Sequence, residues 1–211
     1  MATFSQTRNS ELMYQARQAL LGKWGLAVGT CFVYCLVTIV VQIIPGLAVL
    51  MWIFFIPPMY IGCYVFNLAI SRNQPASTSQ IFDGFNNYWY AIGLYLLMMI
   101  FIILWSLLLV IPGIIAAFSY AMAPYILVDN PTITPLNAIR KSIQMMRGYK
   151  WKLFGLQLRF LGWILLGILT LGIGYLWITP YIEVSYAKFY DDLLKHTNIF
   201  QKTKEYDSSR F

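Results

Sequence analysis

Long apolar segments alternate with short polar segments along almost the whole chain. The apolar segments are residues 24–44, 47–70, 91–111, 113–128, 153–171 and 173–190. Their lengths lie near the roughly 20 residues that an α-helix needs to cross the hydrocarbon core of a bilayer. Because backbone polar groups in lipid must be satisfied within the segment, these segments are predicted to be helices. The pattern therefore predicts an all-α membrane protein with six transmembrane helices.

The six segments form three pairs, because a short turn signal divides the two members of each pair. Proline removes a backbone donor and glycine adopts unusual dihedral angles, so both residues favour turns. The turn signals are Pro45-Gly46, Pro112-Gly113 and Gly172 with Gly174. We therefore expect a single membrane domain, 1–211, made of three helical hairpins. The hairpin units are expected at about 10–70, 77–128 and 134–195, with a polar cytoplasmic tail at 196–211.

The three units resemble one another, which indicates a repeated supersecondary unit. A short amphipathic or interfacial segment that begins at Ser or Thr precedes each hairpin and runs to a Gly and a Trp. In the second apolar segment of each unit, proline is followed by tyrosine. The tryptophans are Trp24, Trp89 and Trp151, and the later motifs are Pro58-Met59-Tyr60, Pro124-Tyr125 and Pro180-Tyr181. The alternative is that these residues mark only the interfaces and turns of any membrane hairpin.

Prolines in the second segments are candidates for breaks in the helices. A proline inside a helix removes a hydrogen bond and clashes with the preceding turn. Broken helices at membrane depth are typical of transporters. The candidates are Pro57, Pro58, Pro124 and Pro180.

Composition and charge support a membrane protein and orient it. Hydrophobic residues make up 59% of the chain and charged residues only 11%, whereas roughly 25% of a soluble domain is charged. All Lys and Arg residues except Arg159 lie in 1–23, 71–90, 129–152 and 188–211, which the hairpins bring to one side. The positive-inside rule therefore predicts that both termini are cytoplasmic. The net charge of +7 reflects this topology, and no nucleic-acid partner is expected.

The connecting segment 134–148 has the pattern of an amphipathic helix. Thr134 suits its cap and Pro135 its first position. Its apolar stripe comprises Leu136, Ile139, Ile143 and Met146. We expect this helix to lie in the headgroup plane, with nearby basic residues facing anionic lipid. The candidate lipid contacts are Arg140, Lys141, Arg147, Lys150 and Lys152. The alternative is a cytoplasmic connector helix that packs against the bundle.

Two charged residues, Arg159 and Glu183, lie inside predicted membrane segments. Charges at this depth are costly and usually find a partner within the bundle. Both lie within a few helical turns of the cytoplasmic side, so an extended Arg159 would reach Glu183. We therefore regard them as a candidate intramembrane ion pair. The alternative is that Arg159 extends to the interface, while Glu183 is protonated or contacts water.

The sequence lacks the residue patterns of an active site. The single histidine, His196, has no metal-ligand pattern around it, and neither a Gly-rich phosphate loop nor a Gly-x-Ser-x-Gly motif occurs. Asp191 and Asp192 suggest a metal-diphosphate site, but adjacent carboxylates at the end of a span more often form a solvated face. We expect no catalytic activity, no metal and no cofactor.

Several short motifs resemble those of a bacterial family of integral membrane proteins. They are Ile111-Pro112-Gly113-Ile114-Ile115, Met145-Met146-x-Gly148, Phe160-Leu161-Gly162-Trp163, Thr170-Leu171-Gly172-Ile173-Gly174, Trp177 with Pro180-Tyr181, and Phe189-Tyr190. The family is grouped as "domain of unknown function 975", and the resemblance covers nearly the whole chain. It is similar in layout to the membrane-embedded domains of some bacterial glycerophosphodiester phosphodiesterases. The resemblance implies a bacterial cell-membrane protein without an established activity.

Two functions from different classes follow from these patterns. The favoured one is a non-enzymatic scaffold, accessory or envelope-protection protein. Its expected partners are the lipid bilayer with its anionic lipids, and either another membrane protein or a second copy of this chain. The alternative is a small transporter or lipid-handling protein, and a membrane enzyme is the least favoured class.

Overall fold

The computed structural model describes residues 5–43, 48–170 and 172–197, and this part of the chain is almost entirely helical. The elements are α1 (Asn9–Leu20), α2 (Trp24–Ile43), α3 (Ala48–Phe54), α4 (Ile56–Ser71), the 3-10 helix η1 (Thr78–Asn87), α5 (Tyr88–Leu108), α6 (Val110–Tyr120), α7 (Ala123–Asp129), α8 (Pro135–Met145), α9 (Lys150–Leu169) and α10 (Tyr175–His196). The described residues form no strand, so the predicted all-α class is confirmed.

By length and composition, four helical segments are able to cross a membrane. They are Leu50–Ser71, Thr78–Leu108, Val110–Asp129 and Lys150–Leu169. A fifth candidate arises if α1 and the first part of α2 count as one broken span, although these two helices meet at 94°. Helix α10 lies outside this group, since charged residues recur along its second half. The structure thus holds four or five candidate spans, compared with six apolar segments in the sequence.

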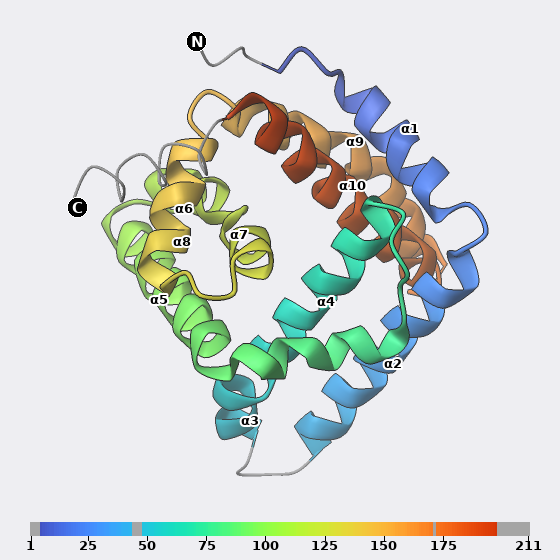
Figure 1. Ribbon diagram of the computed structural model, residues 1–211, viewed down its shortest axis with the longest axis horizontal. Coiled ribbons are helices and arrows are strands. Elements are labelled where there is room, and N and C mark those ends of the chain that lie inside the picture. Colours follow the sequence, from blue (N-terminus) through green and yellow to red (C-terminus); the bar gives the residue numbers. More distant parts are fainter. Residues whose placement is uncertain (1–4, 44–47, 171, 198–211) are drawn as a thin grey trace.

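The second helices of the three expected hairpins meet inside the molecule. In Figure 1, α1 and α2 lie along one side, while α5, α6 and α8 lie along the opposite side. Helix α4 runs between these two groups and packs against η1, α10 and α7. Helix α7 packs in turn against α8. Helices α4, α7 and α10 therefore supply the central contacts of the fold.

Two of the three proline positions coincide with the start of a helix. Pro57 and Pro58 lie in the first turn of α4, directly after the break at Phe55. Pro124 lies in the first turn of α7, after the break between α6 and α7. Proline suits a first turn because its missing N–H group would have no helical partner there. By contrast, α10 continues through Pro180, so this proline does not break the helix.

The turn between α5 and α6 lies earlier than Pro112-Gly113. Leu109 is extended, with φ −163° and ψ 147°, and separates the two helices. Pro112 therefore lies in the first turn of α6. A Cβ atom on Gly113 would lie 2.1 Å from the Ser106 hydroxyl, so this glycine permits the close approach of α5. The hairpin is present, but an extended leucine makes its turn.

Of the other two expected turns, the structure describes the one at Gly172. Gly172 has a φ of +89°, a conformation that side chains with a Cβ atom rarely adopt. It lies between the end of α9 at Leu169 and the start of α10 at Tyr175, and it agrees with the expected turn. The Pro45-Gly46 turn lies outside the described residues, as does the tail from 198 onward.

Helix α8 packs against the bundle by its apolar face. Ala138, Ile139, Ser142 and Met145 are buried, and the helix contacts α5, α6 and α7. Leu136, expected in the apolar stripe, is instead 38% exposed. The apolar face is therefore covered by protein, as the connector-helix alternative predicts.

Ser142 of α8 supplies the hydrogen bonds that the break between α6 and α7 leaves open. Its hydroxyl donates to the Ser119 carbonyl at 2.7 Å and accepts from the Met122 N–H at 3.2 Å. Since an unpaired buried backbone group is costly, this serine makes the break tolerable. The connector helix thus stabilises the interior of the second unit.

Helices α4 and η1 pack backbone against backbone through two glycines. A Cβ atom on Gly62 would lie 1.8 Å from the Ile81 carbonyl oxygen. One on Gly84 would lie 1.9 Å from the Pro58 carbonyl oxygen. No side chain longer than a hydrogen atom fits either position unless the two helices separate.

This contact predicts a sharp difference between two glycine-to-alanine substitutions. Gly62→Ala should destabilise the protein by about 1–3 kcal/mol, because α4 and η1 must move apart. Gly25→Ala is the matched control, since no atom lies within 4 Å of the added methyl group. It should leave stability unchanged or raise it slightly. Thermal unfolding in one detergent gives both values, and equal effects would contradict the packing described.

Candidate functional site

Charged residues from three helices meet at one end of the bundle. Arg72 follows α4, Asp129 ends α7, and Asp191 lies near the end of α10. The Arg72 guanidinium donates from Nη1 to Asp129 Oδ1 at 2.7 Å and from Nη2 to Asp129 Oδ2 at 2.8 Å. It also donates to Asp191 Oδ1, from Nε at 3.0 Å and from Nη2 at 2.8 Å. We call these three residues the Arg72 cluster.

Neighbouring polar groups complete the hydrogen bonding of the Arg72 cluster. The Tyr190 hydroxyl donates to Asp129 Oδ2 at 3.0 Å, and the Ser71 hydroxyl donates to Asp191 Oδ2 at 3.0 Å. The Lys188 ammonium donates to the Ser71 carbonyl, which lies next to Arg72 in the chain. Both carboxylates thus accept several hydrogen bonds, as partly buried ion pairs require.

A second ion pair attaches the N-terminal segment and α9 to the same end of α10. Lys152 Nζ lies 2.8 Å from Asp192 Oδ2, and the hydroxyls of Ser5 and Thr7 also donate to this carboxylate. Burial opposes ionisation of Asp192, but the hydrogen bonds from Lys152, Ser5 and Thr7 outweigh it. They hold the pKa of Asp192 below its ordinary value.

These contacts differ from what the sequence suggested for two groups of residues. Asp191 and Asp192 form ion pairs rather than a solvated face, and the described residues contain no cluster of three or more metal-ligating side chains. Lys152, expected to face lipid, instead binds Asp192. Of the other candidate lipid contacts, Arg140 and Arg147 are exposed, and Lys141 and Lys150 are partly exposed.

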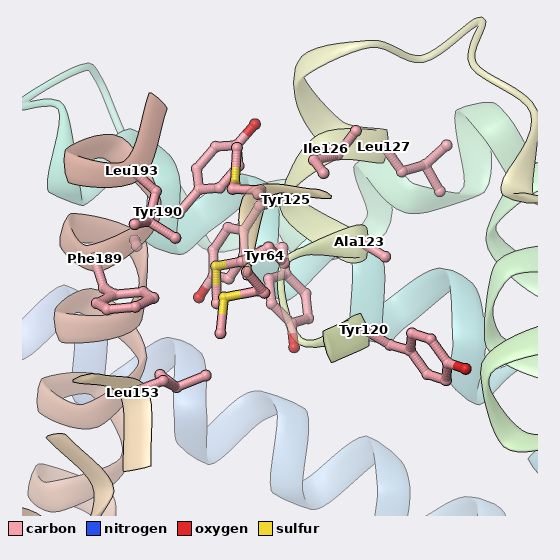
Figure 2. Packing of buried hydrophobic residues seen from close by; sticks show 14 of the residues in the cluster. Tyr64, Tyr120, Ala123, Tyr125, Ile126, Leu127, Leu153, Phe189, Tyr190 and Leu193 are labelled. Carbon is pink, nitrogen blue, oxygen red and sulfur yellow. The ribbon is translucent and has the colours of Figure 1, made fainter. Parts of the chain in front are cut away.

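Tyrosines of the three central helices form a continuous aromatic column. The ring centroids of Tyr64 and Tyr125 lie 4.5 Å apart in an edge-on arrangement, and Tyr125 stacks on Tyr190 at 5.1 Å. Figure 2 shows these three rings next to one another in the buried core. Since the Tyr190 hydroxyl also binds Asp129, the column continues into the Arg72 cluster.

Glu183 of α10 lies on the walls of two pockets near this column. One pocket, of about 120 Å³, is lined by residues of α2, α4 and α10, and we call it the α2 pocket. The other, of about 250 Å³, includes Gln157 of α9 and Tyr186 of α10, and we call it the α9 pocket. Glu183, Tyr60 and Tyr64 line both pockets. The two tyrosine hydroxyls lie 2.5 Å apart.

The structure does not bring Arg159 and Glu183 together. Arg159 is exposed on α9, whereas the next residue, Phe160, is buried and contacts the Tyr181 ring. Consecutive helical residues point in different directions, so a helix that buries Phe160 turns Arg159 outward. Within the described part of the chain, no side chain forms a salt bridge or hydrogen bond with the Glu183 carboxylate.

Comparison with known families agrees with the motifs of the sequence. The family described as "Protein of unknown function (DUF975)" matches residues 107–197. This range contains α6 to α10, and with them Asp129, Lys152, Glu183 and Asp191, but not Arg72. The expected family is thus confirmed over this part, which is less than half of the chain. No curated protein and no solved structure matches the chain.

The Asp192 contacts predict a pH dependence of stability. The pKa of Asp192 is lower in the folded protein than the value of about 3.9 in an unfolded chain. Its contribution is therefore present above about pH 4 and is lost as the pH falls through the lower folded pKa. We expect the melting temperature of Asp192→Asn to fall less between pH 5 and pH 3 than that of the unmodified protein, as measured by thermal unfolding.

Asp83 provides the control for this measurement. It is exposed on η1, and it is absent from the ion pairs of the described residues. Asp83→Asn should keep the pH dependence of the unmodified protein. If Asp192→Asn also keeps that dependence, the ion pair with Lys152 does not stabilise the fold.

Proposed function

We propose that this chain is a non-enzymatic, multi-pass protein of the bacterial cell membrane that acts as a scaffold or accessory subunit. The observation that carries the proposal is the Arg72 cluster, in which the charged groups are bound to one another across three helices. Carboxylates held in this way stabilise helix packing and leave few groups for chemistry. A role in envelope protection is compatible with the same architecture.

The same cluster supports a topology of three hairpins with six crossings. The C-terminal ends of α4, α7 and α10 meet at the Arg72 cluster, so these helices end on one side. The start of α9 and the segment before α1 join them through Asp192. With the positive-inside rule, this side is cytoplasmic and holds both termini.

The outer surface indicates how such a protein would meet its surroundings. Leu107 at the end of α5 and Leu169 at the end of α9 are 83% and 81% exposed. Apolar side chains with this exposure are suited to lipid, to another membrane protein or to a second copy of this chain. The exposed side chains of Arg140 and Arg147 are suited to anionic lipid headgroups.

A second candidate function is a small transporter or lipid-handling protein. It is favoured by Glu183, a carboxylate on the wall of two pockets that also include residues of α4 or α7, the helices that carry Pro57 and Pro124 in their first turns. Ionisable groups inside membrane segments commonly mark ion or substrate pathways. Solute flux or lipid scrambling by the purified protein in liposomes would favour this function over a scaffold.

Cysteine labelling in intact cells tests the proposed topology. In a protein whose three native cysteines are replaced by alanine, single cysteines at Leu109 and Ile173 should react with an impermeant reagent, because both lie between paired helices. Cysteines at Asn73 and Arg147 should react only after the cells are opened. External labelling at both 73 and 147 would contradict the hairpin topology and, with it, the proposed cytoplasmic charged end.

A further inference from the structure

The α2 pocket combines a carboxylate with aromatic walls in an apolar part of the bundle. Its walls include Glu183 and Thr179 of α10, Tyr34 of α2, and Tyr60 and Tyr64 of α4. We propose that this pocket binds a small organic cation with a methylated ammonium group, of about the size of choline. This inference is independent of the scaffold role, since a scaffold and a transporter could both hold such a ligand.

The first argument is electrostatic. An ionised carboxylate in an apolar site is costly unless a positive charge compensates it, and without such a charge the group takes up a proton instead. The described residues offer none, because Arg159 faces outward and the other ion pairs lie at the charged end of the bundle. A bound cation would provide the missing positive charge.

The second argument is the aromatic wall. Electron-rich ring faces attract cations, and quaternary ammonium groups are the ligands that aromatic cages recognise. Tyr60 and Tyr64 meet edge to face, with centroids 4.8 Å apart, and Tyr34 contributes a third ring from α2. Three tyrosines with one carboxylate form the set of groups that such a head group requires.

The third argument selects a methylated ammonium over a primary one. A primary ammonium needs three hydrogen-bond acceptors. The pocket walls include Ala27, Phe66 and Pro180, and the Thr30 hydroxyl already bonds with Thr78 at 3.1 Å. Ala27, Phe66 and Pro180 contact methyl groups favourably and offer no side-chain acceptor to an N–H group, so a methylated ammonium suits this part of the wall, while Glu183, Asn67 and Thr179 remain available to the charge and to a hydroxyl group.

Volume limits the size of the ligand. The α2 pocket measures about 120 Å³, somewhat less than the roughly 150 Å³ of an engineered cavity that accepts benzene. Choline or tetramethylammonium is therefore near the upper size, and cations with several aromatic rings are too large. The Thr179 and Asn67 side chains on the wall are candidates to bind the hydroxyl group of choline.

Calorimetry on the full-length protein in a maltoside detergent tests the proposal directly. Choline is compared with 3,3-dimethyl-1-butanol, which has the same shape but a carbon atom in place of the charged nitrogen. Choline should bind about tenfold more tightly than this neutral analogue, because only the cation interacts with Glu183 and the ring faces. Equal affinities, or no saturable choline binding below about 10 mM, would overturn the proposal without any variant being needed.

Substitutions then test the named residues. Glu183→Gln should weaken choline binding about tenfold or more and leave binding of the neutral analogue unchanged. Glu11→Gln, which removes an exposed carboxylate of α1, is the matched control and should change neither. Tyr34→Phe should retain choline binding and Tyr34→Leu should lose it, because the ring face and not the hydroxyl contacts the cation. Equal choline affinity in the Glu183→Gln variant and the unmodified protein would contradict the site.

Glycerophosphocholine distinguishes a free cation from a lipid headgroup. If it binds more tightly than choline, the site takes the methylated head group of a lipid. If it binds more weakly, the site takes a free cation, because its phosphate is repelled by Glu183. Both results require that the pocket binds a methylated ammonium group. If choline, glycerophosphocholine and tetramethylammonium all fail to bind, the proposed site is excluded.

Discussion

Arg72 holds the three central helices together at one end of the molecule. Its planar guanidinium binds both oxygens of Asp129 and, from a neighbouring edge, Asp191. Only arginine offers this fork of donors, so lysine would not make the same set of bonds. Helices in a bilayer gain little from hydrophobic burial against each other, because lipid is equally apolar. Polar contacts of this kind therefore carry much of the specificity with which α4, α7 and α10 pack.

Other features of the fold follow from this arrangement. Tyr190 donates to Asp129 and stacks on Tyr125, so the Arg72 cluster also orients the aromatic column. Helix α7, short and separated from α6, contributes Tyr125 to that column and packs against α4 and α8. The break is tolerated because Ser142 binds the backbone on both sides of it. The irregular centre of the bundle thus depends on side chains from distant segments.

The apolar pattern was sufficient to predict the helical class and most of the helices. The prolines were candidates for breaks in the helices, and Pro57, Pro58 and Pro124 do lie directly after breaks, in the first turns of α4 and α7, whereas α10 continues through Pro180. The ion pairs could not be predicted from such local patterns, because their members are far apart in the sequence. Arg72 lies 57 positions from Asp129 and 119 from Asp191. Arg159 and Glu183 were paired by depth in the membrane alone, but Arg159 lies on the outward side of α9. The sequence assigns Lys150 and Lys152 the same role as lipid contacts. In the structure Lys152 points toward Asp192 and binds it, whereas Lys150 is partly exposed.

The most direct test of this account is a set of mutant cycles between Arg72 and its two aspartates. Arg72→Gln, Asp129→Asn and Asp191→Asn are compared with the corresponding double variants by thermal unfolding in one detergent. We expect each single variant to lose about 1–3 kcal/mol, since the pairs are partly buried, and each double variant to lose clearly less than the sum. Additive losses, within about 0.5 kcal/mol for both pairs, would show that Arg72 does not join the helices.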